Sequence, residues 1–418
     1  MKKVEKSNPL KIHPTLIEVV QKSLAEVFIN NRKTDKVLAE VLRSNKKWGS
    51  RDRAFIAETT YEIVRYWRLM LFIAEVDGRH ISASKISKVV GSYLVLQNAD
   101  VNNFPDWKGL RYDLLKQKYQ AAQEQRKVFH SVPDWLDALG EAELGIEKWE
   151  LELAAMNKQA PVCIRTNTLK NTRQELIQNL EKENVETTTV PGVEQALYLK
   201  KRQNIFLTKA FKDGRFEVQD AGSQLIGKFL DVAPGMRVID ACAGAGGKAL
   251  HLANLMENKG QIIAMDIEEW KLDELKKRAK RDGIHNIETR VIAGKTIKRL
   301  KHSADRLLLD VPCSGLGTLR RNPDAKWKLQ EEFITEIKKV QEDILHRYTE
   351  MLKPGGKVVY ATCSILPSES EDQVQKFLEH HPNYKLIAER RTSPAIEGFD
   401  GFYMALMEKT AASEQVIE

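Results

Sequence analysis

The stretch Val238-Ile239-Asp240-Ala241-Cys242-Ala243-Gly244-Ala245-Gly246-Gly247-Lys248 decides the fold, because it has the pattern of a strand, a tight turn of small residues and the start of a helix. Glycines in such a turn let the backbone approach a ligand at the helix N-terminus. A plain strand-to-helix connection would look the same. The next apolar run, however, ends at Asp266, 20 residues beyond Gly246, where an acid can hydrogen-bond both hydroxyls of a ribose. The stretch therefore indicates a nucleotide-type cofactor fold.

Two further side chains around this turn indicate which cofactor it binds. Asp240 ends the first strand and can face an amine, and Lys248 can meet a carboxylate. A ligand with a ribose, an amino group and a carboxylate is S-adenosylmethionine rather than NAD. We expect this cofactor to contact the acids, the lysine and the small residues of the turn, which are Asp240, Ala243, Gly244, Gly246, Gly247, Lys248 and Asp266.

Short apolar runs lie on both sides of the turn, and helical stretches separate them. The runs are residues 162–167, 187–190, 238–240, 261–266, 289–293, 306–310 and 357–361. Strands that alternate with helices in this way predict a mostly parallel α/β sheet that is buried on both faces.

Residues 12–155 have a helical pattern instead. Leu16, Val20, Leu24 and Val27 recur at intervals of three and four residues, as one face of a helix requires. A turn at 131–136, in the tail of this region, starts a new helix. We expect an all-α domain at 1–130, a linker helix and a small α+β subdomain at 131–215, an α/β domain at 216–410 and a tail at 411–418.

Composition restricts the setting of the protein. The chain has 418 residues, 42% of them apolar, and a net charge of +8. No apolar run is long enough for a membrane span, and no signal peptide is evident. The four cysteines lack a disulfide spacing, so we expect reduced thiols and a cytoplasmic location. The positive charge favours a polyanion such as nucleic acid but fits many other proteins. His380-His381 lacks partners at ligand spacing, so we expect no metal.

Two cysteines stand at the ends of apolar strands, in Asp310-Val311-Pro312-Cys313-Ser314-Gly315 and Val358-Val359-Tyr360-Ala361-Thr362-Cys363-Ser364. A thiolate that adds to C6 of cytosine turns the ring into an enamine, whose C5 can attack a sulfonium methyl group. An acid near N3 and O2 favours the adduct, and Asp310 is placed for that. A buried cysteine is more often a small core residue, which is our reading of Cys163 and Cys242.

The longer blocks around these cysteines resemble one family. The first runs from Asp310 to Trp327, and the second is Ala361-Thr362-Cys363-Ser364-Ile365-Leu366-Pro367-Ser368-Glu369. Together they resemble the RNA cytosine-C5 methyltransferases of the RsmB/Sun type. Weaker matches are residues 165–170, 218–224 and 400–405. The resemblance covers about residues 133–409, and Ser50-Arg51-Asp52-Arg53-Ala54-Phe55 is similar to the NusB-like RNA-binding domain of some members.

The resemblance implies a fold and roles for single residues. The expected fold is a Rossmann-like class I S-adenosylmethionine-dependent methyltransferase domain, with a mostly parallel seven-stranded sheet, preceded by an all-α domain. Cys363 corresponds to the nucleophile and Cys313 to the thiol that assists release, whereas DNA cytosine methyltransferases attack with the Pro-Cys thiol. Asp310 and Pro312 are expected at the cofactor as well. The small subdomain at 131–215 is expected to recognise RNA.

Two stretches depart from the family pattern. The family's cofactor loop reads Ala-Ala-Pro-Gly-Gly-Lys-Thr, whereas this chain has Ala243-Gly244-Ala245-Gly246-Gly247-Lys248-Ala249. The Gly-Gly-Lys core remains. Ala293-Gly294-Lys295 replaces an Asp that the family often places near the adenine, so we expect a weaker contact there.

Candidate RNA contacts follow the first cysteine. Arg320, Arg321, Lys326 and Trp327 could hold phosphates and a stacked base, although Trp327 fits a core position equally well. Arg165 and Asn167 are further candidates from the weaker match. The basic helix at 271–281 reads mainly as a solvated face.

The sequence thus predicts a monomeric S-adenosylmethionine-dependent RNA cytosine-C5 methyltransferase, with ribosomal 16S RNA as the first candidate substrate. Its target base must be single-stranded or flipped out to reach the thiol. Alternatives are a transfer-RNA methyltransferase and a non-catalytic RNA-binding assembly factor with a decayed cofactor site. A methyltransferase for small molecules or proteins is disfavoured, because O- and N-methylation need no covalent thiol.

Overall fold

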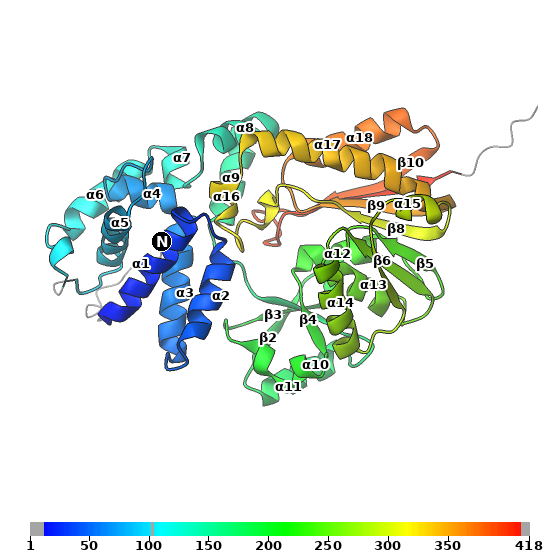
Figure 1. Cartoon of the computed structure of the whole chain (residues 1–418), viewed down its shortest axis with the longest axis horizontal. Helices are drawn as coiled ribbons and strands as arrows, with labels where there is room; N and C mark the ends of the chain where they lie inside the picture. Colours follow the sequence, from blue (N-terminus) through cyan, green and yellow to red (C-terminus); the bar gives the residue numbers. More distant parts are fainter. Residues whose placement is uncertain (1–11, 102–103, 411–418) are drawn as a thin grey trace, which may run out of the picture. The chain divides into compact units, whose positions relative to one another are not determined.

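A computed structural model describes residues 12–101 and 104–410 of the chain (Figure 1). The described residues fall into two units. The first comprises those of Met1–Lys158 together with Leu319–Glu331, and the second comprises Gln159–Thr318 and those of Glu332–Glu418. The chain therefore leaves the second unit after Thr318 and returns to it at Glu332.

The first unit is helical, as the spacing of apolar residues predicts. Val20, Leu24 and Val27 of the first helix are buried, whereas Leu16 is only partly buried and its neighbour Ile17 takes the core position. The ring of Phe28 at the end of that helix stacks on Trp67, with 3.8 Å between the centroids. The principal helices are α1 (Pro14–Phe28), α2 (Thr34–Ser44), α3 (Ser50–Arg65), α4 (Trp67–Ile73), α5 (Ala83–Leu96), α6 (Tyr112–Ala122), α8 (Asp134–Leu144) and α9 (Ile146–Met156). This division groups α8 and α9 with the N-terminal helices, whereas the sequence places them with the small subdomain.

The segment Leu319–Glu331 packs into this helical unit. It contains the short helix α16 (Ala325–Lys328). Trp327 Nε1 donates to Val64 O at 2.7 Å, and Thr34 N donates to Asp324 Oδ2 at 3.1 Å. The chain directly after the Pro-Cys loop is therefore fixed by helices that lie far away in the sequence.

The second unit contains two sheets. The smaller one has the order β2-β3-β1-β4, and all its pairings are antiparallel. Its strands are β1 (Cys163–Thr166), β2 (Thr187–Val190), β3 (Val193–Leu199) and β4 (Phe216–Val218). The helices α10 (Arg173–Lys182) and α11 (Lys209–Lys212) accompany it. Its core contains Ile164, Leu176, Leu197 and Phe216.

The larger sheet has seven strands in the order β10-β11-β9-β8-β5-β6-β7. The strands are β5 (Arg237–Asp240), β6 (Gln261–Asp266), β7 (Ile287–Val291), β8 (Ala304–Asp310), β9 (Leu352–Thr362), β10 (Tyr384–Arg391) and β11 (Tyr403–Lys409). The five strands from β5 to β9 pair in parallel, and β10 and β11 are antiparallel. The predicted fold class is confirmed, although β7 begins two residues before the predicted run.

Both faces of this sheet are buried, as a parallel sheet requires. Helices cover it on either side in Figure 1, among them α12 (Ala221–Phe229), α13 (Gly247–Leu255), α14 (Glu269–Asp282), α17 (Glu331–Tyr348) and α18 (Glu371–His380). Alternate residues of one strand enter different cores: Val238 packs in one, and Ile239 packs in the other.

The strand order places the site. From β5 the chain continues to β6 and β7 on one side and returns to β8 and β9 on the other. The connections therefore diverge next to β5, and ligands of such sheets bind at that switch point, beyond the carboxyl ends of the strands. Asp240, Asp266 and Asp310 end β5, β6 and β8.

Candidate active site

The glycine loop between β5 and α13 has a backbone that only glycine adopts readily. Gly244 and Gly246 have φ of 53° and 88°. A Cβ on Gly246 would lie 2.4 Å from Leu275 Cγ of α14, whereas one on Gly247 would meet nothing within 4 Å. The loop therefore fits tightly against α14 at Gly246 and leaves open space at Gly247, where a ligand can approach.

Asp266 holds this loop from the end of β6. Its Oδ2 accepts from Gly244 N at 2.9 Å, and its Oδ1 accepts from Glu268 N at 2.9 Å. Each oxygen has a second lone pair, so the carboxylate can also accept hydrogen bonds from ribose hydroxyls. The sequence located this acid but not its part in shaping the loop.

Asp240 is the unusual group of the site. Its side chain is 1% exposed, and neither carboxylate oxygen has a hydrogen-bond partner among the described residues. Burial, together with the charge of Asp310, raises the pKa of Asp240 to about 7. A buried carboxylate without partners is unfavourable, and a ligand that brings an ammonium group would satisfy it. The unpaired carboxylate of Asp240, the carboxylate of Asp266 and the open glycine loop therefore fit S-adenosylmethionine.

Lys248 pairs with Asp310 rather than standing apart from it. Lys248 Nζ lies 2.5 Å from Asp310 Oδ2, and it also lies 5.5 Å from the ring centroid of Phe402. Burial opposes the charge of the ammonium, but the ion pair outweighs it and raises the pKa of Lys248. A proton-bearing ion pair thus stands at the carboxyl ends of the central strands.

The two cysteines come together from neighbouring parallel strands. Asp310 of β8 pairs in register with Ala361 of β9, so Cys313 and Cys363 leave the sheet side by side. Their Sγ atoms are 3.3 Å apart. The hydrogen bond to Cys363, together with burial, raises the pKa of Cys313 well above its usual value. Cys313 is thereby held as a thiol that can donate to Cys363.

Glu369, which ends the second block of the sequence and had no predicted role, joins the loops of both cysteines. It is fully buried. Its Oε1 accepts from Ser314 N at 2.8 Å and from Gln341 Nε2 at 3.0 Å. Its Oε2 accepts from Ser314 Oγ and Ser364 Oγ, both at 2.5 Å. The only signal in the sequence is a serine after each cysteine and an acid six residues after Cys363.

Pro312, a predicted cofactor position, and Ala293-Gly294-Lys295, the departure near the expected adenine, both follow strands of the larger sheet. Pro312 O accepts from Gln341 Nε2 at 3.0 Å, which ties the Pro-Cys loop to α17. Ala293-Gly294-Lys295 connects β7 to the short helix α15 (Thr296–Arg299), next to Ile292, whose N–H donates to Asp266 O at 2.9 Å. Ile267 and Trp270, which follow Asp266, are 70% and 63% exposed and offer apolar surface beside this acid.

Arg165 and Asn167, expected at the substrate, are buried braces in the structure. Arg165 donates to Gly247 O at 2.9 Å and to Gln219 Oε1. Asn167 Nδ2 donates to the carbonyls of Gly214 and Asp282 at 2.7 and 2.8 Å. Burial lowers the pKa of Arg165 to about 10, so it stays charged at neutral pH. Both tie the small sheet to the elements around the glycine loop.

The segment after Cys313 is also largely internal. Arg320 and Lys326 are buried, and Lys326 Nζ donates to Asn157 Oδ1 at 3.2 Å. Burial lowers the pKa of Lys326 well below its usual value. Trp327 takes the core position that the sequence allowed, and Arg321 is partly exposed. RNA contact by these four residues stays a prediction, and the structure gives three of them a packing role.

Cys163 and Cys242 belong to other elements than the pair of thiols, the first to β1 and the second to the turn after β5. Cys163 is 1% exposed in β1, and burial raises the pKa of Cys242 well above its usual value. Over residues 12–101 and 104–410, no three His, Cys, Asp or Glu side chains group closely enough to hold a metal ion. Within the same ranges no helix has the length and apolarity needed to cross a membrane.

Two family models match the chain. The model described as 16S rRNA methyltransferase RsmB/F matches residues 228–408. A ferredoxin-like domain of the RsmF/B-like methyltransferases matches residues 132–206. The first match spans the strands of the larger sheet, and the second spans α8, α9 and the strands β1 to β3 of the small sheet.

Several known proteins are similar over most of the chain. The "Probable ribosomal RNA small subunit methyltransferase B" of Synechocystis sp. is 32% identical over 376 residues, which are 82% of this chain and 84% of that protein. The crystal structure of PH0851 has a TM-score of 0.82 at 27% identity and covers 96% of this chain and 100% of its own. A methyltransferase homolog protein from Pyrococcus horikoshii has a TM-score of 0.62 at 29% identity and covers 69% and 99%.

Proposed function

Because the chain belongs to the ribosomal RNA small subunit methyltransferase B family, we propose that it methylates C5 of a cytosine in that RNA through a covalent cysteine adduct. The observation that carries the proposal is the pair of thiols, 3.3 Å apart, at the ends of β8 and β9. Methylation of an oxygen or an exocyclic nitrogen requires no thiol, whereas C5 of cytosine must first be activated.

The first step belongs to Cys363. Its thiolate adds to C6, and the ring nitrogen N3 takes up a proton as the C5–C6 double bond opens to an enamine. The Lys248–Asp310 pair supplies a proton-bearing group for N3 at the carboxyl end of β8. The raised pKa of Cys313 keeps that residue a neutral thiol in the resting enzyme, where it can donate a hydrogen bond to Cys363. We assign the attack to Cys363 because the Thr-Cys position carries the nucleophile in the family that the sequence resembles.

S-adenosylmethionine, when bound, supplies the electrophilic methyl group. Asp240 would hold its amino group, Asp266 its ribose, and the backbone of Gly246 and Gly247 would approach it closely. After C5 carries the methyl group, its proton passes to a base, N3 returns its proton, and the C5–C6 double bond reforms as the C6–Sγ bond breaks. We assign assistance of this release to Cys313, which touches Cys363.

Mapping of 5-methylcytosine tests the proposal. RNA from a strain that lacks the gene should lose the modification at one small-subunit position, and the wild-type gene should restore it. Cys363→Ala should not restore it, whereas Cys163→Ala, a matched thiol removal away from the site, should. If both small-subunit RNA and transfer RNA keep every 5-methylcytosine without the gene, the proposed reaction is wrong. A purified chain that also fails to bind S-adenosylmethionine would favour the assembly-factor alternative.

A further inference from the structure

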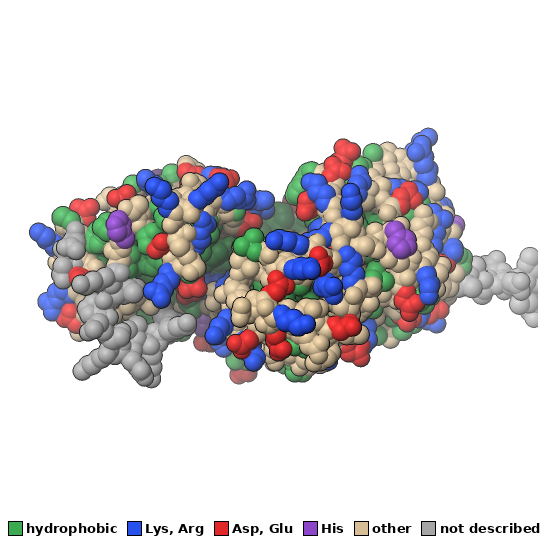
Figure 2. All heavy atoms as spheres, turned by 90° about the horizontal axis from the view of Figure 1, so that it is seen from below, with side chains coloured by type: hydrophobic (Ala, Val, Ile, Leu, Met, Phe, Trp, Pro, Cys, Tyr) green, Lys and Arg blue, Asp and Glu red, His purple; other side chains and the backbone are tan. Residues whose placement is uncertain are grey.

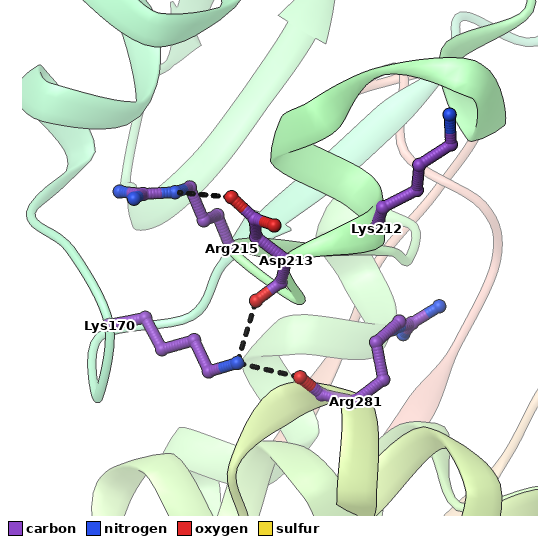
Figure 3. Close-up of a pocket in the computed structure, with 5 residues that line it drawn as sticks. All are labelled: Lys170, Lys212, Asp213, Arg215 and Arg281. Carbon is purple, nitrogen blue, oxygen red and sulfur yellow. Dashed lines mark hydrogen bonds and ion pairs between the residues drawn. The ribbon is translucent and has the colours of Figure 1, made fainter.

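The small sheet carries a pocket that the proposed reaction does not use. The pocket has a volume of about 520 Å³ and is lined by Lys170, Lys212, Asp213, Arg215 and Arg281 (Figure 3). Lys170 follows β1, Lys212 ends α11, Arg215 precedes β4, and Arg281 lies in the last turn of α14. Four bases thus line the pocket with one acid.

The positive charge of this pocket is only partly compensated. Lys170 Nζ donates to the backbone carbonyls of Asp213 and Arg281, both at 2.6 Å, which fixes the ammonium without neutralising it. Arg215 reaches Asp213 only through Nε at 3.7 Å, and its outer nitrogens point away from that carboxylate (Figure 3). An ammonium has three N–H groups, so Lys170 retains one for a ligand.

Arg281 has a different role in the same wall. It is ion-paired with Glu217 and Asp282, and its guanidinium lies 4.2 Å from the ring centroid of Phe211. With Arg281 neutralised, Lys170, Lys212 and Arg215 oppose Asp213 alone, which leaves three positive charges against one negative. Like charges that line one pocket repel each other, and a bound anion would offset that repulsion. The Lys212 ammonium points away from Lys170 and Arg215 in Figure 3, so it would have to turn toward such an anion.

The pocket is connected to the cofactor loop. Glu217 also binds Arg278, whose NH1 donates to Ala245 O of the glycine loop at 2.7 Å. The carboxylate of Glu217 therefore links Arg281 of the pocket wall, through Arg278, to the glycine loop. Figure 2 looks at the side of the second unit on which α10 and α11 lie, and Lys and Arg side chains gather there with acids between them.

From this geometry we infer that the pocket binds a backbone phosphate of the substrate RNA and so positions the strand that carries the target cytosine. The inference rests on the proposed function for the identity of the RNA. Phosphate contacts from Lys and Arg fix the register of a nucleic acid without reading its sequence. The pocket would thus add affinity and position, and base choice would remain at the thiols.

A pair of double variants tests this inference. Lys212→Ala/Arg215→Ala removes two charges from the pocket. Lys200→Ala/Lys201→Ala removes two charges just beyond β3, whose end pairs with the start of β1, at the opposite end of the small sheet from the pocket. RNA affinity is measured over a salt series for both variants and for the wild-type chain, together with KM for RNA, kcat and S-adenosylmethionine binding.

We expect the pocket variant to lower the slope of log affinity against log salt by about 0.7–0.9, the value for one phosphate. Its KM for RNA should rise about tenfold at moderate salt, while kcat and cofactor binding stay unchanged. Equal slopes for the pocket and control variants would overturn the inference. So would a pocket variant that loses cofactor binding, because the cluster would then be structural. If the pocket variant does not fold, Lys212→Glu, at an exposed position, takes its place.

Inorganic phosphate separates a small-anion site from an RNA site. If phosphate binds the wild-type chain and the control but not the pocket variant, while RNA slopes are equal, the pocket takes small anions and the RNA inference is wrong. The outcome is independent of the proposed reaction. The wild-type chain could show a steeper dependence of log affinity on log salt than the pocket variant and yet not methylate the RNA. That result would support the pocket inference and contradict the proposed reaction.

Discussion

Glu369 shows how single side chains set the geometry of the thiols. One buried carboxylate accepts four hydrogen bonds, and three of them come from the serines that follow Cys313 and Cys363. The two thiol loops belong to different strands, so their spacing depends on this bridge as well as on the sheet. Glu369 is therefore a positioning residue, since none of its described contacts is to a thiol.

Replacement of Glu369 should affect turnover more than cofactor binding. Glu369→Gln keeps the volume but replaces an acceptor oxygen by an NH₂ group that faces donors. We expect kcat to fall about ten- to 100-fold, because small misplacements of reacting groups have effects of this size. S-adenosylmethionine affinity, measured by calorimetry, should change less than about twofold. Glu379→Gln is the control, because Glu379 is an exposed residue of α18, the helix that follows Glu369. Equal loss of cofactor affinity and kcat would point to general misfolding instead.

The roles of the two thiols lead to opposite results on removal. In Cys313→Ala, Cys363 can still attack, but release is impaired, so the enzyme should accumulate as a covalent RNA adduct. A denaturing gel with substrate RNA should show a shifted band for this variant and none for Cys363→Ala. A band with Cys363→Ala alone would reverse the assignment.

Asp240 predicts a pH dependence of cofactor binding. Its pKa of about 7 means that the unliganded site carries a proton below pH 7. The amino group of the cofactor requires the carboxylate, so binding releases that proton and affinity rises with pH, by up to about tenfold per unit below pH 7. Asp240→Asn should bind more weakly and lose this dependence between pH 5.5 and 7. Asp266→Ala should instead weaken S-adenosylmethionine binding about ten- to 150-fold and keep the pH dependence that Asp240 causes.

Protonation of Asp240 also affects the stability of the unliganded fold, which should fall with rising pH whereas cofactor affinity rises. Because the folded-state pKa of Asp240 lies above the ordinary value of 3.8, the folded state binds a proton more tightly than the unfolded chain does. This group therefore stabilises the unliganded fold at low pH, and that contribution is lost as the pH rises toward about 7. Melting of the unliganded chain should show it, and Asp240→Asn should remove it.

Among the elements, the glycine loop allows the effect of tight packing on stability to be separated from the effect of open space on cofactor binding. Gly246→Ala places a Cβ 2.4 Å from Leu275 Cγ at a φ of 88°, so we expect a loss of about 1–3 kcal/mol in stability. Gly247→Ala has open space and should leave the melting temperature nearly unchanged. It should nevertheless weaken S-adenosylmethionine binding, because the added methyl occupies the approach of the ligand. A Gly247→Ala variant with wild-type cofactor affinity would place the ligand elsewhere.

The elements of the sheet were predictable because their signal is local. Apolar runs predicted β5, β6 and β8 to within two residues at each end, whereas β9 begins five residues before its predicted run. The acids that end three of the strands indicated the edge of the proposed site. The partners of Arg320, Lys326 and Trp327 were not predictable, because they come from α3 and α9, more than 160 positions away. Glu369 was missed for a related reason, since its role depends on two strands becoming neighbours.

The two units together lead to a prediction about truncation. A chain that begins at residue 159 retains every proposed cofactor contact, since all lie beyond residue 239, so S-adenosylmethionine should still bind. Segment 319–331 would lose Val64, Asn157 and Thr34, its partners in the helical unit. We expect protease cleavage within 319–331 and a large loss of RNA methylation by the truncated chain. Intact cofactor binding with wild-type methylation would show that the helical unit is dispensable.

The placement of residues 319–331 also has a consequence during translation. The helical unit lacks part of its packing until its last segment has been synthesised, 173 residues after position 158. At about 5–20 residues per second, the nascent chain waits roughly 10–35 s for that piece. In that interval the surfaces around Val64 and Asn157 have no native cover. This protein should therefore not mature strictly in the order in which its domains leave the ribosome, and its earliest helices would be the ones that need a chaperone.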